Sequence, residues 1–264
     1  MAELVDSHCH LDFSQFAEDR EGVVERAREA GVRRIIAPGL DMASSEKVVK
    51  LAEQFEGVYA AVGVHPNTNV AVGELELATL RELAGHPKVV AIGEIGLDYY
   101  RDRTPHDRQQ ANFAAQLRLA SEVGLPVIIH NRDASSDVLD MLSAWRNGAS
   151  DVLADRPGVL HSFMDEMTVA DEALAAGFYL GFSGPLTYKK SIMLRRVAAE
   201  VPADRLLVET DAPFLTPHPL RSHRNEPAYV QHVAERLAEV RDASLDAIAE
   251  LTTANAERLF ALDG

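Results

Sequence analysis

The chain has 264 residues, of which 47% are hydrophobic and 25% charged, and this composition excludes wholesale disorder. Its 26 basic and 41 acidic side chains give a net charge of −15, which disfavours a protein that coats a nucleic-acid duplex by broad electrostatic contact. An enzyme that takes one phosphate group onto bound cations remains compatible with this charge, because the cations supply positive charge locally.

Targeting signals are not evident. Residues 1–13 have no basic flank, apolar stretch or small-residue cleavage site, so they are not expected to form a signal peptide. No apolar run approaches the ~20 residues that span a bilayer, and no membrane association is expected. The single cysteine, Cys9, excludes an internal disulfide. These features together favour a cytoplasmic protein.

Eight short apolar runs follow one another along the chain, and each is near-continuous rather than alternating. Strands that are buried on both faces of a parallel sheet have this pattern. The predicted strands are residues 4–10, 34–39, 58–65, 89–97, 126–131, 158–163, 178–183 and 206–211. Amphipathic helical patterns lie between them, for example at residues 22–30, 44–55, 106–123, 136–145 and 193–200, and two more helices are predicted at 229–240 and 244–262.

The alternation of strands and helices predicts a parallel sheet with right-handed crossovers, and no Gly/Ser/Pro-rich linker divides it. Eight such units in ~250 residues match a closed barrel. A doubly wound open sheet is the alternative, but it usually has fewer strands and a glycine-rich first turn. We therefore predict an α/β fold, a single (β/α)8 TIM barrel that spans residues 1–264.

The first predicted strand ends with two histidines, His8 and His10. Because side chains alternate along a strand, both imidazoles point to the same side, while Cys9 points to the other. Two imidazoles on one side of a strand end can chelate a single ion. On its own, this short pattern is equally compatible with two surface histidines that bind no metal.

Four further ionisable side chains stand in or at the ends of apolar strands: Glu94, His130, His161 and Asp211. Such a group is costly to desolvate unless it is paired or bound to a metal. Barrel closure brings all six candidates to the C-terminal ends of the strands, where barrel enzymes have their active sites. This convergence predicts a metal site at that mouth.

The number and type of these side chains indicate two divalent ions, because four histidines and two carboxylates exceed the needs of one tetrahedral ion. Glu94 can give one oxygen to each ion and is the expected bridge. The mixed nitrogen and oxygen donors suit Zn²⁺ and Mn²⁺, and Mg²⁺ is a further candidate although it usually avoids imidazole.

Seven segments, spread in order over nearly the whole chain, resemble those of the TatD-type metal-dependent deoxyribonucleases, which belong to the amidohydrolase-like metallohydrolases. They are DSHCH at 6–10, GVHP at 63–66, GEIGLDY at 93–99, PVIIHNR at 126–132, HSF at 161–163, ETDAP at 209–213 and RNEP at 224–227. The combination of GEIGLDY, ETDAP and RNEP is specific.

The resemblance implies a division of the ligands and a reaction. One ion would be held by His8, His10, Glu94 and Asp211, and the other by Glu94, His130 and His161. The implied reaction is hydrolysis of a DNA phosphodiester, typically exonucleolytic from a 3′ end. The expected partner is therefore DNA, single-stranded or at 3′ ends.

Physical chemistry agrees with that division of ligands. Bound divalent ions acidify a water towards neutrality and neutralise charge on the phosphoryl oxygens. Asp211, beside this water, is the best candidate for general base or proton shuttle. His65 ends the third strand at the same mouth and is predicted to contact the phosphate or the leaving group. The predicted catalytic residues are thus Asp211, Glu94 and His65.

Basic residues in the loops at the mouth are candidates for gripping the substrate. Arg132 and Arg224 are predicted to bind it, because each lies within or beside a motif of the resemblance. For most of the other basic residues a solvated surface role is favoured. These others are Arg101, Arg103, Lys189, Lys190 and Arg221.

Two tyrosines have two interpretations each, and one further carboxylate is a candidate for support. Tyr99 and Tyr100 could stack on a base, as in single-strand binders, or cap the barrel core. Glu209 alternates with Asp211 onto the same face and is a candidate to support a ligand histidine.

Two loops at the mouth depart from the family pattern. Residues 164–166 read Met-Asp-Glu where relatives often have a small residue and glycine, and residues 221–224 read Arg-Ser-His-Arg where glycine and lysine are common. Two alternatives therefore stay open beside the nuclease. They are a hydrolase of a non-nucleic-acid ester, lactone or amide on the same scaffold, and a non-catalytic metal-binding barrel. The oligomeric state is left open as well.

Overall fold

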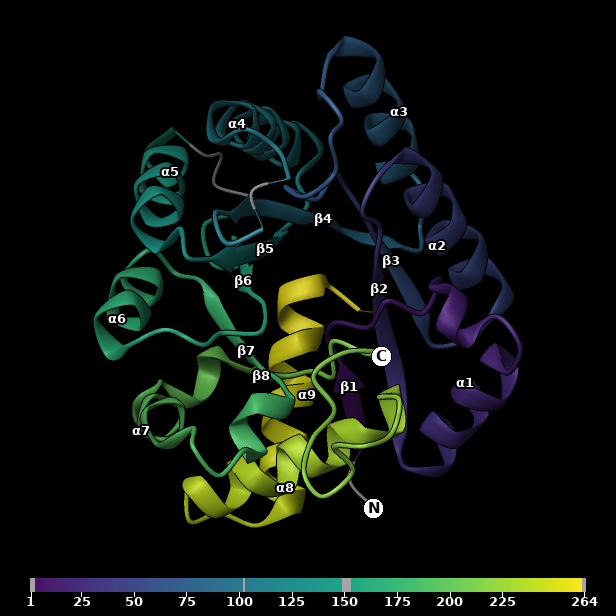
Figure 1. The fold of residues 1–264 in the computed structure, drawn as a ribbon, viewed down its shortest axis with the longest axis vertical. Coiled ribbons are helices and arrows are strands. Elements are labelled where there is room, and N and C mark those ends of the chain that lie inside the picture. Colours follow the sequence, from purple (N-terminus) through teal and green to yellow (C-terminus); the bar gives the residue numbers. More distant parts are fainter. Residues whose placement is uncertain (1–2, 102, 149–152, 263–264) are drawn as a thin grey trace.

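The computed structural model describes residues 3–101, 103–148 and 153–262, and it confirms the predicted barrel (Figure 1). The predicted span of 1–264 also includes residues outside these ranges. Eight parallel strands pair in sequence order from β1 to β8. The strands are β1 (Leu4–Asp6), β2 (Val32–Pro38), β3 (Val58–Val62), β4 (Val89–Asp98), β5 (Val127–Arg132), β6 (Gly158–Leu160), β7 (Tyr179–Phe182) and β8 (Leu206–Val208).

Helices follow the strands and surround the sheet (Figure 1). They are α1 (Arg20–Glu29), α2 (Met42–Gln54), α3 (Glu74–Ala84), α4 (His106–Val123), α5 (Ser135–Gly148), α6 (Met167–Ala175), α7 (Ile192–Glu200), α8 (Val230–Val240) and α9 (Leu245–Phe260). Within the described ranges, no helix combines the length and apolarity needed to cross a membrane.

The interior of the barrel is filled from the strands and from the last helix. Each strand contributes apolar residues to one cluster, among them Val5 of β1 and Ile128 of β5, and Leu259 and Phe260 of α9 join it. The α9 side chain of Asn255 donates to the Leu206 carbonyl at the start of β8 (2.9 Å), so α9 closes the N-terminal end of the barrel. The opposite end, where the strands finish, is left for the site.

Backbone hydrogen bonds close the seam between β8 and β1 just beyond the two strand ends. The Asp211 amide donates to the His8 carbonyl (2.9 Å), and the His10 amide donates to the Ala212 carbonyl (2.8 Å). Three candidate ligands are therefore tied together by the same hydrogen bonds that complete the ring of strands.

Several strands end earlier than predicted, which changes where four candidate ligands sit. β1 ends at Asp6, β6 at Leu160 and β8 at Val208, so His8, His10, His161 and Asp211 lie in the segments that follow. The backbone leaves the strand geometry there, and Asp211 has a φ of +56°. Only Glu94 and His130 lie within strands, because β4 and β5 continue to Asp98 and Arg132.

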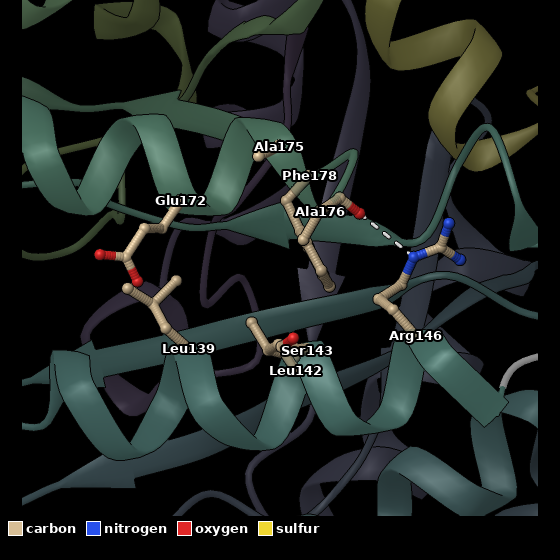
Figure 2. A pocket seen from close by; sticks show the side chains of 8 residues that line it. All are labelled: Leu139, Leu142, Ser143, Arg146, Glu172, Ala175, Ala176 and Phe178. Carbon is tan, nitrogen blue, oxygen red and sulfur yellow. Dashed lines mark hydrogen bonds between the residues drawn. The ribbon is translucent and has the colours of Figure 1, made fainter.

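Figure 2 shows a pocket of about 450 Å³ between α5 and α6, on the outside of the barrel. Leu139, Leu142 and Phe178 line its apolar part. At one end the Arg146 Nε donates to the Ala176 carbonyl (3.1 Å). The pocket contains none of the predicted site residues and lies apart from the mouth.

We expect the Cys9 thiol to be unreactive in the native protein. Its side chain is fully buried beside the β8–β1 seam. Burial raises the pKa of this thiol well above its ordinary value, and the nearby Asp6 and Asp211 carboxylates add to the effect, so little thiolate forms at mildly alkaline pH. A chromogenic disulfide reagent should label Cys9 in denaturant but not in buffer. Rapid labelling in buffer would contradict a closed seam.

Candidate metal centre

Glu94 of β4 lies at the centre of a ring of histidines and is only 2% exposed. Its Oε2 lies 3.4 Å from the His8 Nε2 and 3.7 Å from the His10 Nε2. Its Oε1 lies 2.7 Å from the His130 Nδ1 and 2.9 Å from the His161 Nε2. The two oxygens of one carboxylate thus face two separate groups of donor atoms.

The first donor group consists of His8, His10, Asp211 and the Glu94 Oε2. The two histidine Nε2 atoms are 3.3 Å apart, and the Asp211 Oδ1 lies 3.7 Å from that of His8 and 3.3 Å from that of His10. Ligands of a tetrahedral ion with bonds of ~2.0–2.1 Å are separated by ~3.3–3.4 Å. The Glu94 Oε2 is buried without a hydrogen-bond partner in the described part of the chain. This donor set therefore fits a divalent cation.

The second donor group surrounds the Glu94 Oε1. The His130 Nδ1 and His161 Nε2 lie 3.3 Å from each other, and the His65 Nε2 lies 3.4 Å from the Oε1. His65 was predicted to contact the phosphate or leaving group, and the structure brings it close enough to be a candidate ligand as well. The rings of His8 and His161 stack with centroids 3.9 Å apart, which places the two donor groups side by side.

Asp98 supports the second donor group, and the sequence interpretation missed it. Its Oδ2 lies 3.2 Å from the His130 Nε2 and accepts a hydrogen bond from the Asn67 Nδ2 (2.6 Å). Burial alone would raise the pKa of Asp98, but hydrogen bonds from His130, from the Arg101 amide and from Asn67 hold it well below its ordinary value. A signal was available, because Asp98 lies four residues after Glu94 in one strand and so shares its face.

Glu209 supports His161 from the opposite side. It is fully buried, its Oε1 accepts from the Ser162 amide and lies 3.5 Å from the His161 Nδ1, and its Oε2 accepts from the Ser7 hydroxyl (3.3 Å). Carboxylates that bond the second nitrogen of a ligand histidine fix the ring orientation. The placement agrees with the support role expected for Glu209.

The two carboxylates at the centre are held ionised. Burial alone would raise the pKa of Glu94, but the charges of His161 and His65 and hydrogen bonds from His130 and His161 lower it well below its ordinary value. Burial would likewise raise the pKa of Asp211, and its hydrogen bond with His10 brings it below the ordinary value. Ionised carboxylates are the form that binds metal ions.

Arg132 lies at the mouth, beside the second donor group. Its guanidinium carbon is 4.0 Å above the Tyr100 ring, and both residues line a cavity of about 300 Å³ that reaches His161. Asp165, from the atypical loop, lines the same cavity, and its Oδ2 accepts hydrogen bonds from the Asn131 Nδ2 (2.9 Å) and the Ser135 hydroxyl (3.0 Å).

Arg224 is placed differently from the prediction. Its Nη2 donates to the Asp19 Oδ2 (2.8 Å), its Nη1 donates to the Gln15 carbonyl (2.6 Å), and its guanidinium lies over the Phe16 ring. The hydrogen bond from Arg224 is the main cause that lowers the pKa of Asp19 to about 2. Arg224 thus holds the loop after β1 against the RNEP segment. Its role in substrate binding stays a prediction that this pairing does not favour.

Tyr99 and Tyr100 have different surroundings. The Tyr99 ring stacks on that of His106 (3.7 Å), and its hydroxyl donates to the Asp137 Oδ2 (2.5 Å). Tyr99 therefore packs against α4 and α5, whereas Tyr100 is exposed under Arg132.

The fold agrees with comparisons to known proteins. Residues 5–261 match the protein family described as TatD related DNase. The chain is 45% identical over 260 residues to the uncharacterized metal-dependent hydrolase YabD of Bacillus subtilis (strain 168), covering 98% of this chain and 100% of that protein. It is 39% identical over 263 residues to the 3′-5′ ssDNA/RNA exonuclease TatD of Cronobacter sakazakii, covering 97% of each. The crystal structure of YJJV, a TatD homologue from Escherichia coli K12, matches with a TM-score of 0.91 at 34% identity over 98% of each chain.

A parallel barrel with histidine and carboxylate donors at its C-terminal mouth defines the class, an amidohydrolase-like metallohydrolase. Within that class, the chain belongs to the TatD family of metal-dependent hydrolases.

Replacing Gly181 by alanine is expected to disturb the second donor group. An added Cβ would lie 2.3 Å from the Glu209 Oε2, so this carboxylate would be pushed from its place beside His161. Overpacking of this kind costs about 1–3 kcal/mol. Thermal denaturation and elemental analysis of bound metal should both show a loss for G181A.

Gly22→Ala on α1 is the matched control. Its Cβ would approach only the flexible end of the Arg26 side chain (3.2 Å), and alanine is the better helix former, so stability should be retained or raised. Wild-type stability and metal content in G181A would contradict the support role of Glu209.

Proposed function

We propose that this TatD-family hydrolase is a nuclease that cleaves DNA phosphodiester bonds from the 3′ ends of single strands, with two divalent ions at the mouth of the barrel. The observation that carries the proposal is the placement of the Glu94 carboxylate, because each of its two oxygens faces a different donor group. Paired ions that share a carboxylate are a recurring device for in-line displacement at phosphorus. Relatives named as 3′-5′ ssDNA/RNA exonucleases support the choice of substrate.

The two proposed ions would be held by two sets of ligands that share one carboxylate. His8, His10 and Asp211 would hold one, His130 and His161 the other, with Glu94 between them. Zn²⁺ and Mn²⁺ are the favoured ions for this donor set, and Mg²⁺ is a further candidate. When bound, such ions acidify water and neutralise charge on phosphoryl oxygens.

Asp211 is the residue that we propose to accept the proton of the attacking water. Its side chain keeps 13% of its surface exposed, whereas that of Glu94 keeps 2%, so Asp211 is the more accessible of the two central carboxylates. Its lowered pKa leaves it ionised at neutral pH. A base in this position can pass the proton on to solvent or to the leaving oxygen.

His65 and Arg132 are proposed to contact the substrate. His65 is 12% exposed, and its Nδ1 accepts a hydrogen bond from the Asn67 amide (3.0 Å), so its Nε2 is the nitrogen that can donate a hydrogen bond to a phosphate oxygen. Arg132 carries a fixed positive charge at the edge of the cavity beside His161.

One observation favours a second candidate, the hydrolysis of a non-nucleic-acid ester, lactone or amide. Asp133 and Asp165 line the cavity beside His161, and two carboxylates there would repel a second phosphate. A neutral substrate would not meet that repulsion. The two candidates differ in whether the wild-type protein releases mononucleotides from an oligodeoxynucleotide.

Asp211→Asn is expected to lower the rate of 3′ mononucleotide release by about 100-fold, because the proton acceptor is lost. The substrate would be a single-stranded oligodeoxynucleotide with a 5′ label, assayed with Mn²⁺ and with Mg²⁺, before and after chelation. A 3′-blocked copy tests the polarity. Asp171→Asn on the exposed face of α6 is the matched control and should keep wild-type activity. Activity that survives both chelation and D211N would rule out the proposal.

Glu94→Gln should remove both ions, whereas His10→Ala should remove one and leave the other. The physical reason is that the two oxygens of Glu94 face the two donor groups, whereas His10 lies in the first group. Metal analysis of the purified variants by mass spectrometry distinguishes these outcomes. Equal losses in the two variants would speak against a bridging carboxylate.

A further inference from the structure

Two arginines at the mouth each rest on a tyrosine ring. The guanidinium carbon of Arg221 lies 3.7 Å from the centroid of the Tyr188 ring, and that of Arg132 lies 4.0 Å from the Tyr100 ring. Neither arginine forms an ion pair with a carboxylate over residues 3–101, 103–148 and 153–262. In a chain with a net charge of −15, uncompensated cations beside a candidate active site need an explanation.

The Arg221–Tyr188 pair is anchored next to the first donor group. Tyr188 follows the short helix η3 (Gly184–Thr187) after β7, and its hydroxyl donates to the Thr216 carbonyl (3.2 Å), five residues after Asp211. Burial raises the pKa of Tyr188, the Arg221 charge and a hydrogen bond from Arg221 oppose this, and the Asp211 charge adds to it, as expected for neighbouring groups.

The Arg132–Tyr100 pair lies next to the second donor group instead. Arg132 is the last residue of β5, two residues after His130. Two strands, β6 and β7, separate β5 from β8 in the ring (Figure 1). The two stacked pairs therefore flank the candidate metal centre from different sides.

Stacking prepares an arginine to bind a phosphate. A guanidinium that lies over an aromatic ring keeps N–H groups at its edge for other partners, and the ring limits its orientations. Less conformational freedom is then lost when the edge binds two oxygens of one phosphate. Arg221 is exposed, and the adjacent Lys189 and Lys190 are exposed as well.

Arg224, in the same loop, cannot serve in this way while it is paired. Its two terminal nitrogens bind Asp19, so its charge is compensated and its edge is occupied. Arg221 is thus the residue of this loop whose charge is available to a ligand.

We infer that Arg221, held on Tyr188, binds a phosphate of the substrate strand next to the scissile one, on the Asp211 side of the centre. The inference rests on the proposed nuclease function. It extends that function by giving the strand a second backbone contact, opposite to Arg132. A substrate with one phosphate would not reach this contact.

The test compares two substrates in wild-type protein and in Arg221→Ala. The first is a single-stranded oligothymidylate, and the second is bis(p-nitrophenyl) phosphate, which has no flanking phosphate. Loss of a charged hydrogen bond to phosphate should raise the KM for the oligothymidylate about 10-fold with little change in kcat. The KM for the small diester should change far less. The slope of log KM against log salt for the oligothymidylate should fall by about 0.7.

Two further variants make the result specific. Arg118→Ala, on the exposed face of α4, makes the same charge change away from the mouth and should leave both KM values as in the wild type. Arg221→Lys keeps the charge without the planar stack, and should recover only part of the lost affinity.

The outcomes separate the two proposals. Wild-type protein that does not cleave oligothymidylate overturns the nuclease function and this inference with it. Cleavage by the wild type with an unchanged KM and salt slope in R221A overturns the inference alone. An equal rise of KM for both substrates also overturns it, because Arg221 would then act on the centre itself.

Discussion

The structure depends on one buried negative charge, that of Glu94. A carboxylate that is 2% exposed is expensive to keep ionised unless its charge is balanced on every side. Five histidines surround it, the pKa of three of them (His10, His130 and His161) is raised, and Asp98 and Glu209 lie beside the second nitrogens of His130 and His161. Divalent ions held by these donor groups would balance the same charge. The architecture of the mouth is therefore set by electrostatics as much as by packing.

The same residues close the barrel and build the centre. Asp6, at the end of β1, accepts hydrogen bonds from the amide and the hydroxyl of Thr210 (2.9 and 2.6 Å), and the seam bonds of His8 and His10 follow directly. A substitution that loosens the seam would therefore move ligands before it unfolds strands. This coupling explains why polar residues are concentrated at β1 and β8, where the ring has to be completed.

Much of this was predictable from the sequence, because strand periodicity and strand ends are local properties. The eight apolar runs and the side chains at their ends gave the barrel, the mouth and the six candidate ligands. The pairing of Arg224 with Asp19 was not predictable, since it depends on how the loop after β1 folds over the last motif. The lengths of β1, β6 and β8 were overestimated because the predicted strands were extended to the polar side chains that follow, whereas the ladder stops at Asp6, Leu160 and Val208. Likewise, the reach of His65 to the Glu94 Oε1 follows from barrel curvature, which no local pattern encodes.

The order of the ligands along the chain has a consequence for synthesis. The second donor group is complete once His161 has left the ribosome, whereas the first needs Asp211, although His8 and His10 are among the earliest residues made. A growing chain would thus hold its two N-terminal imidazoles without the Asp211 carboxylate until the segment after β8 arrives and closes the ring. Capture of an ion by the first group would then coincide with the arrival of the last strand, and the filled centre would mark a finished barrel.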